Sequence, residues 1–140
     1  MSNHLETVES IYQAFGRGDV AAILEQLSPD VQWDPWTHHS AQQAGYDLLQ
    51  ARTGRAAVAD FFSLLAAQTF HEFKVLDIVA GERQAAAELQ VDFTYGTTGR
   101  RVRDEEVHLW SFGADGKVTR FRHYIDTAKH MEAAGLLAAA

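Results

Sequence analysis

The stretch from Glu105 to Asp126 carries two histidines among large aromatic side chains, which makes it the first place to look for chemistry. It consists of two runs in which apolar and polar residues alternate, on either side of Asp115-Gly116. This dipeptide is typical of a hairpin turn between strands. Successive side chains on a strand point to opposite faces of the sheet. One face of this predicted hairpin therefore presents Glu106, His108, Trp110, Phe112, Phe121, His123 and Ile125. We expect that face to form one wall of an aromatic pocket containing two imidazoles.

A second candidate for chemistry is Asp34, in the sequence Trp33-Asp34-Pro35 with Trp36 just beyond. Neighbouring indole rings would partly desolvate the carboxylate, which makes it a stronger base near neutral pH. A histidine across a pocket can donate a hydrogen bond to an enolate oxygen as negative charge develops there. Asp34 as base, with His108 and His123 as polarising groups, would suit proton abstraction next to a carbonyl.

The same three residues also have structural interpretations. Asp34 could satisfy backbone donors at a strand end, because aspartate is common in such turns. His108 and His123 could be hydrogen-bonded core residues, since partly buried histidines are common. His38-His39 could suggest a metal site, but adjacent side chains point apart and no second ligand spacing accompanies them. We therefore expect neither a metal nor a cofactor.

The opposite face of the predicted hairpin resembles an interface. A monomer would expose an apolar patch on a broad sheet, and tyrosine and arginine are enriched at interface cores. Carboxylates on the neighbouring strand could pair with the arginines of a two-fold copy. We therefore expect a homodimer packed sheet to sheet, with Arg120, Arg122 and Tyr124 buried in it. This face comprises Val107, Leu109, Ser111, Val118, Arg120, Arg122 and Tyr124, beside Glu88, Gln90 and Asp92.

Composition narrows the class of protein. A chain of 140 residues fits a single domain over residues 1–140. The net charge of −7 argues against a nucleic-acid or anionic-membrane partner, and the absence of cysteine excludes disulfides and thiol chemistry. No apolar run approaches the length of a membrane span, and the N-terminus lacks the pattern of a signal peptide. A cytoplasmic protein is the expectation.

Hydrophobic spacing predicts the elements that must position these residues. Apolar side chains at three- and four-residue steps predict helices first, and alternating side chains predict long strands afterwards. This order implies an α+β fold, with helices on one side of a sheet. The segment 36–53 has no clear period and reads as a long loop with a short helical piece near Leu48. The predicted helices cover 2–15, a short segment after Asp19, and 55–68; the predicted strands cover 31–34, 70–79, 85–95 and the two arms of the hairpin; the tail from Thr127 is short and helical or frayed.

Together these features resemble a known family. They include the Gly18-Asp19 break after an amphipathic first helix, Leu27-Ser28-Pro29-Asp30-Val31, and Gly54 before the third helix. They also include Asp115-Gly116-Lys117-Val118 and His123-Tyr124-Ile125-Asp126 near the end. The chain is similar to the SnoaL-like branch of the nuclear transport factor 2-like superfamily, related to ketosteroid isomerase. The resemblance implies a cone-shaped, curved antiparallel sheet wrapped over three N-terminal helices, of the cystatin-like kind, with a pocket at the wide end.

The resemblance also implies roles for individual residues. Asp34 matches the position of the catalytic aspartate base of the isomerases, and His108 matches that of a protonated aspartic acid that donates to an oxyanion. His123 and Ile125 match pocket-lining positions, and Asp126 matches an aspartate that serves cyclisation. The first-helix tyrosine of the isomerases is replaced by Ile11, with Tyr12 beside it, so half of the oxyanion hole is missing. The expected substrate-binding residues are Trp36, Phe61, Trp110, Phe112, Phe121, Ile125 and Asp126.

Two functions from different classes follow. One is a small isomerase, cyclase or related lyase that acts on a hydrophobic carbonyl compound without a cofactor. The other is a non-catalytic module that binds a small hydrophobic molecule or serves dimerisation. Epoxide hydrolysis would need an Asp-Arg-Asp arrangement, and the inward faces offer no arginine. The discriminating feature is whether Asp34, His108 and His123 converge on one cavity.

Overall fold

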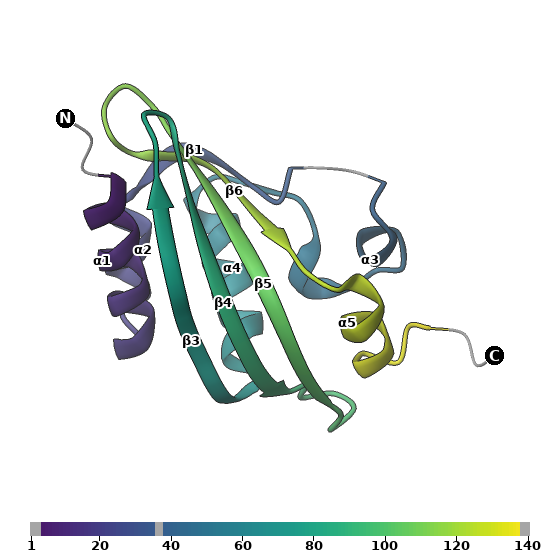
Figure 1. The fold of residues 1–140 in the computed structure, drawn as a ribbon. Coiled ribbons are helices and arrows are strands. Elements are labelled where there is room, and N and C mark those ends of the chain that lie inside the picture. Colours follow the sequence, from purple (N-terminus) through teal and green to yellow (C-terminus); the bar gives the residue numbers. More distant parts are fainter. Residues whose placement is uncertain (1–3, 36–37, 138–140) are drawn as a thin grey trace.

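The fold pairs one curved sheet with helices, as predicted. The computed structural model describes residues 4–35 and 38–137. Figure 1 shows β3, β4, β5 and β6 side by side with α4 behind them, α1 and α2 beside β3, and α3 and α5 at the other end. In chain order the elements are α1 (His4–Arg17), α2 (Val20–Glu25), β1 (Leu27–Trp33), α3 (Ser40–Gln43), the 3₁₀ turn η1 (Asp47–Leu49), β2 (Arg52–Thr53), α4 (Arg55–Ala66), β3 (Thr69–Ala80), β4 (Gln84–Thr94), β5 (Arg101–Phe112), β6 (Val118–Tyr124) and α5 (Thr127–Ala133).

The sheet is mixed rather than wholly antiparallel, which corrects one detail of the prediction. Its strand order is β2-β1-β6-β5-β4-β3, and β1 runs parallel to β6. A parallel pair needs a long crossover between its strands, and here the crossover contains α4 and the other long strands. The consequence for the site is that Trp33, at the end of β1, lies opposite Phe121 on β6.

Local sequence explains where the helices begin. Asp19 caps α2, because its carboxylate accepts a hydrogen bond from the backbone N–H of Ala22. Gly54 precedes α4 with φ at +87°, a left-handed conformation that glycine adopts without steric cost. α1 then buries Val8, Ile11 and Ala14 against the rest of the fold.

The predicted loop over 36–53 contains more regular structure than expected. It holds α3, η1 and the short strand β2, and Tyr46, Leu48 and Leu49 are buried core residues. His39 is the N-cap of α3, where its Nδ1 accepts a hydrogen bond from the backbone N–H of Gln42. Trp36 lies outside the described residues, so its predicted contact with a ligand stays a prediction.

A bulge in the hairpin corrects the predicted face of one residue. Ser111 pairs with Arg120, but Phe112 pairs with Val118, so one extra residue is inserted on β6. Because side chains alternate along a strand, the insertion moves Val118 to the inner face, where it is fully buried. Val118 is therefore core and not part of the outer surface.

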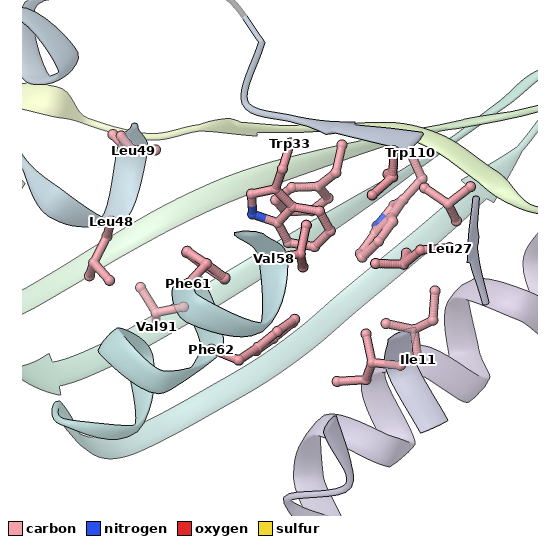
Figure 2. Packing of buried hydrophobic residues seen from close by; sticks show 14 of the residues in the cluster. Ile11, Leu27, Trp33, Leu48, Leu49, Val58, Phe61, Phe62, Val91 and Trp110 are labelled. Atoms are coloured by element: carbon pink, nitrogen blue, oxygen red, sulfur yellow. The ribbon is translucent and has the colours of Figure 1, made fainter. Parts of the chain in front are cut away.

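The core lies between α4 and the inner face of the sheet. Figure 2 shows Phe61 and Phe62 of α4 directed toward Trp33 and Trp110 of the sheet. Trp33 stacks on Phe121 with ring centroids 4.0 Å apart, and Trp110 meets the same ring at 4.4 Å. The longest helix of residues 4–35 and 38–137 has 14 residues, and none there is long and apolar enough to cross a membrane.

Candidate active site

A cavity of about 70 Å³ opens inside the aromatic core, between α1, α4, η1 and the inner sheet face. This volume counts the space open to the centres of water-sized groups, of which one water needs about 10–15 Å³. The cavity therefore holds roughly five such groups. A ring compound would therefore fill it and would need lining side chains to adjust. The predicted residues that line it are Phe61, His108, Trp110, Phe121, His123 and Ile125.

Three predicted site residues do not line this cavity. Phe112 lies at the other end of the hairpin, where its ring stacks on His4 at 3.9 Å. Asp126 is the N-cap of α5, and its exposed carboxylate accepts a hydrogen bond from the backbone N–H of Lys129. Asp34 is completely buried behind the wall. None of the three lines the cavity, and their expected contact with a ligand stays a prediction.

Asp34 reaches the cavity through His123. The backbone at Asp34 has φ at +48°, and its carboxylate turns toward β6. Its Oδ1 accepts a hydrogen bond from the backbone N–H of His123 at 2.8 Å, and its Oδ2 lies 2.8 Å from His123 Nδ1. Burial alone would lower the pKa of His123, but the charge of Asp34 and its hydrogen bond raise that pKa above its ordinary value. The pair therefore presents an oriented, unusually basic imidazole to the cavity.

A second hydrogen-bonded chain starts on α1. Trp110 Nε1 donates to Tyr12 Oη at 3.1 Å, and Tyr12 Oη lies 2.7 Å from His108 Nδ1. His108 Nε2 lies 3.2 Å from Glu106 Oε1. Burial lowers the pKa of His108, which keeps its ring neutral.

Directions along this chain follow from the donor inventory. An ionised carboxylate only accepts hydrogen bonds, so His108 must carry its proton on Nε2 and donate to Glu106. Its Nδ1 then accepts, and Tyr12 donates to it. Both ring nitrogens of His108 and the hydroxyl proton of Tyr12 are thus committed, so neither residue has a proton to spare for a ligand in this state.

His130, on α5, completes the polar network. Its Nε2 lies 2.9 Å from Asp104 Oδ2 and 3.4 Å from Glu106 Oε2, and its Nδ1 lies 3.0 Å from Tyr46 Oη. Burial alone would lower the pKa of His130, but the two carboxylates raise it to about 9. Burial alone would raise the pKa of Glu106, yet hydrogen bonds from His108 and His130 hold it below its ordinary value.

This cluster has two possible interpretations. Asp104, Glu106 and His130 each offer a ligand atom within 4.8 Å of the others, a spacing that could hold a metal ion. In the structure the imidazolium of His130 bridges the two carboxylates directly, so the pairing already balances much of their charge. A protonated His130 donates from both nitrogens, and the proton of Tyr46 is then left for another acceptor.

Sequence reasoning missed several of these residues. Tyr12, named above only as the neighbour of Ile11, lines the cavity together with Ile11, and its hydroxyl contacts His108. Glu106 shares the inner face with His108, as the alternation predicts, but the sequence pattern does not indicate its hydrogen bond to that histidine. His130 had no local signal, because only the fold brings α5 against β5.

Two polar atoms of the described cavity wall lack a hydrogen-bond partner. One is Trp33 Nε1, on a side chain that is 1% exposed. The other is His123 Nε2, since the hydrogen bonds of this ring run through Nδ1 to Asp34. The cavity wall thus holds the unpaired donor of Trp33 and the free proton acceptor of His123, together with the spare hydroxyl proton of Tyr46 when His130 is protonated.

Comparison with known proteins agrees with the fold. The model of the SnoaL-like domain family matches residues 8–121, and no curated protein matches the chain. A nuclear transport factor 2-like protein of unknown function from Burkholderia pseudomallei K96243 is 27% identical, with a TM-score of 0.78 over 95% of this chain and 98% of that one. TerC, co-crystallised with polyporic acid, is 22% identical, with a TM-score of 0.74 over 94% and 98%. A candidate polyketide cyclase from Pseudomonas putida KT2440 is 24% identical, with a TM-score of 0.70 over 95% and 98%.

Proposed function

This chain belongs to the SnoaL-like domain family, and we propose that it binds a small hydrophobic carbonyl compound and moves a proton at the carbon beside the carbonyl, as isomerases and cyclases do. The observation that carries the proposal is the Asp34–His123 pair. Asp34 fixes Nδ1 of the imidazole at 2.8 Å, and Nε2 is left free on the cavity wall.

His123 acts as the base in this proposal, and Asp34 positions it. His123 Nε2 takes a proton from the α-carbon, so a C–H bond breaks and an N–H bond forms. The electron pair moves into an enolate, whose charge rests on the carbonyl oxygen. Return of the proton to another carbon gives an isomer, and attack of the enolate on a carbonyl carbon in the same molecule closes a ring. Asp34 keeps the imidazolium oriented and stabilised throughout, as the carboxylate does in other Asp–His pairs.

The surroundings of His123 favour this chemistry. Its ring lies edge-on to Phe121 at 4.5 Å and to His108 at 4.8 Å, and Phe61 lies 5.6 Å away. Such a dry wall strengthens electrostatic interactions with a developing charge. The small volume favours a ligand of one or two rings over a steroid. The ligand of TerC and the candidate cyclase from Pseudomonas putida support a small organic ligand.

Deuterium exchange in heavy water tests the proposal without knowledge of the natural substrate. We expect the protein to accelerate exchange of the methyl protons of acetophenone, in proportion to protein concentration, as followed by proton NMR. A thermal-shift screen against phenolic ketones, aromatic polyketides and terpenoids, with steroids as oversized controls, would then rank ligands. A non-catalytic binding module would raise the melting temperature with the same ketones but leave exchange at the buffer rate, and that result would overturn the proposal.

We also propose that the outer face of the sheet forms a homodimer interface. Val79, Val107 and Tyr124 are 62%, 40% and 37% exposed, and Val107 pairs directly with Tyr124 across β5 and β6. The guanidinium of Arg122 lies 5.4 Å from the ring of Tyr124. The apolar surface and the arginines of a two-fold copy would be buried together, with carboxylates such as Glu88 as partners.

We predict that Tyr124→Glu makes the protein monomeric at micromolar concentration. In a two-fold dimer the introduced glutamates of both protomers would be buried close together, and their negative charges would repel. Light scattering after size-exclusion chromatography measures this. Leu5→Glu is the matched control, since Leu5 is similarly exposed at 40% but lies on α1 and not on the outer face of the sheet. A monomeric wild type, or a Tyr124→Glu variant that stays dimeric, would refute the interface.

A further inference from the structure

The indole N–H of Trp33 is a buried donor without a partner. Trp33 is 1% exposed, and its Nε1 makes no hydrogen bond to the described residues. The indole nitrogen is a donor only, and buried donors in folded proteins are nearly always paired because an unpaired one destabilises the fold. Because Trp33 lines the cavity, its unpaired donor points to a ligand acceptor, which would reach it once neighbouring side chains shift.

Trp33 faces the same part of the cavity as His123. Phe61 and Phe121 are neighbours of both rings: Trp33 lies 5.5 Å and 4.0 Å from them, and His123 lies 5.6 Å and 4.5 Å from them. Figure 2 shows the nitrogen of Trp33 on the side of the ring that faces Phe61, Leu48 and Leu49. A group bound beside Phe61 can therefore meet both the free donor and the free acceptor.

The other donors of the wall, apart from Tyr46, are committed to partners within the protein. Trp110 Nε1 donates to Tyr12, and the protons of Tyr12 and His108 serve the chain to Glu106. The rival is Tyr46, whose own proton is left over when His130 donates to it. Tyr46 belongs to the cluster beside α5, where its ring lies 5.7 Å from His130.

We propose that Trp33 Nε1–H binds the carbonyl oxygen of the ligand and so selects neutral ketones or enones for this site. The inference deepens the proposed function and rests on it, because the held oxygen is the one on which the enolate charge would develop beside His123. A neutral indole donor suits an oxygen that gains charge only during the reaction.

A matched pair of probes isolates this hydrogen bond. Acetophenone and α-methylstyrene have nearly the same shape, but the second carries a methylene group where the first carries the carbonyl oxygen. The protein has three tryptophans, so ¹⁵N-labelled indole gives three N–H signals, and Trp33→Phe identifies the one from Trp33. We expect acetophenone to shift the Trp33 signal downfield and α-methylstyrene to leave it near its original position. Trp33→Phe should reduce the preference for acetophenone over α-methylstyrene by about five- to tenfold, the effect of one net hydrogen bond.

Several outcomes would overturn the inference. A Trp33 signal that does not move while acetophenone binds would do so, and this measurement on the wild-type protein needs the variant only to assign the signal. Loss of the preference in Tyr46→Phe but not in Trp33→Phe would transfer the donor role to Tyr46. Failure of acetophenone to bind at all would refute both proposals. Binding with the expected shift but without deuterium exchange would refute the catalytic proposal alone, whereas exchange without the shift would refute the Trp33 assignment alone.

Discussion

Replacing Asp34 by asparagine should lower the rate of α-proton exchange by about a hundredfold to ten-thousandfold while leaving the affinity for acetophenone nearly unchanged. The reason lies in how the carboxylate is bound. Its Oδ1 accepts the backbone N–H of His123, so the amide oxygen of asparagine must take that position. The amide nitrogen would then face Nδ1 of the ring and donate to it. His123 would carry its proton on Nε2, where it cannot accept another.

The pH dependence supplies a second signature of the same prediction. A general base works in its neutral form, so the wild-type rate should rise with pH through the raised pKa of His123. In Asp34→Asn the carboxylate that raises this pKa is gone, so the remaining activity should titrate at lower pH. Proton NMR at several pH values measures both profiles.

Controls separate the positioning role of Asp34 from direct proton abstraction. His123→Gln should lose as much activity as Asp34→Asn, and the double variant little more, because the two residues act as one unit. Asp126→Asn makes the same chemical change at an exposed N-cap, where asparagine caps equally well, and should retain full activity. Wild-type exchange in His123→Gln would show that Asp34 reaches the substrate itself and that our assignment is wrong.

The fold was accessible from sequence because its signals are local. The alternation along 85–95 and the Asp115-Gly116 turn predict β4, β5 and β6 and place His108, Trp110, Phe121 and His123 on one face, as observed. The bulge on β6 was not predicted, because strict alternation of side chains assumes that no residue is inserted. Val118 was therefore assigned to the wrong face. The parallel pairing of β1 with β6 escaped it as well, because it joins segments far apart in the chain.

The candidate site was only partly accessible for a related reason. Residue type identified Asp34 and His123 as candidates. Which of them faces the cavity as the base depends on the positive φ at Asp34, which turns its carboxylate behind the imidazole of His123. Asp126 was predicted as a ligand contact, and in the structure its carboxylate caps α5 instead of lining the cavity. The network of Tyr12, Glu106 and His130 joins α1, β5 and α5, and no spacing within one element encodes it.

That network should dominate the pH dependence of stability. His130 has its pKa raised to about 9 in the folded protein, against about 6.5 in an unfolded chain. A group whose pKa rises on folding contributes stability that is fully present below the unfolded value and lost as the pH climbs through the folded one. The window is therefore about pH 6.5 to 9, and the free energy of unfolding should fall across it by about 3 kcal/mol from His130. His123, whose pKa is also raised, adds to the fall in the same direction.

Replacing His130 by leucine should cost about 3–5 kcal/mol of stability at pH 7, because it leaves Asp104 and Glu106 buried without their shared cation. Their side chains are only 4% and 7% exposed, so water cannot replace it. Urea denaturation at pH 6.5, 7 and 9 measures both effects. The variant should also lose most of the decline between pH 6.5 and 9, whereas His71→Leu, at an exposed histidine on β3, should keep both the stability and the decline. A His130→Leu protein as stable as the wild type at pH 7, with the same decline toward pH 9, would mean that His130 is not the shared cation. The ionised state of Glu106, and with it the tautomer of His108 and the direction of the Tyr12 hydroxyl, would then need another cause.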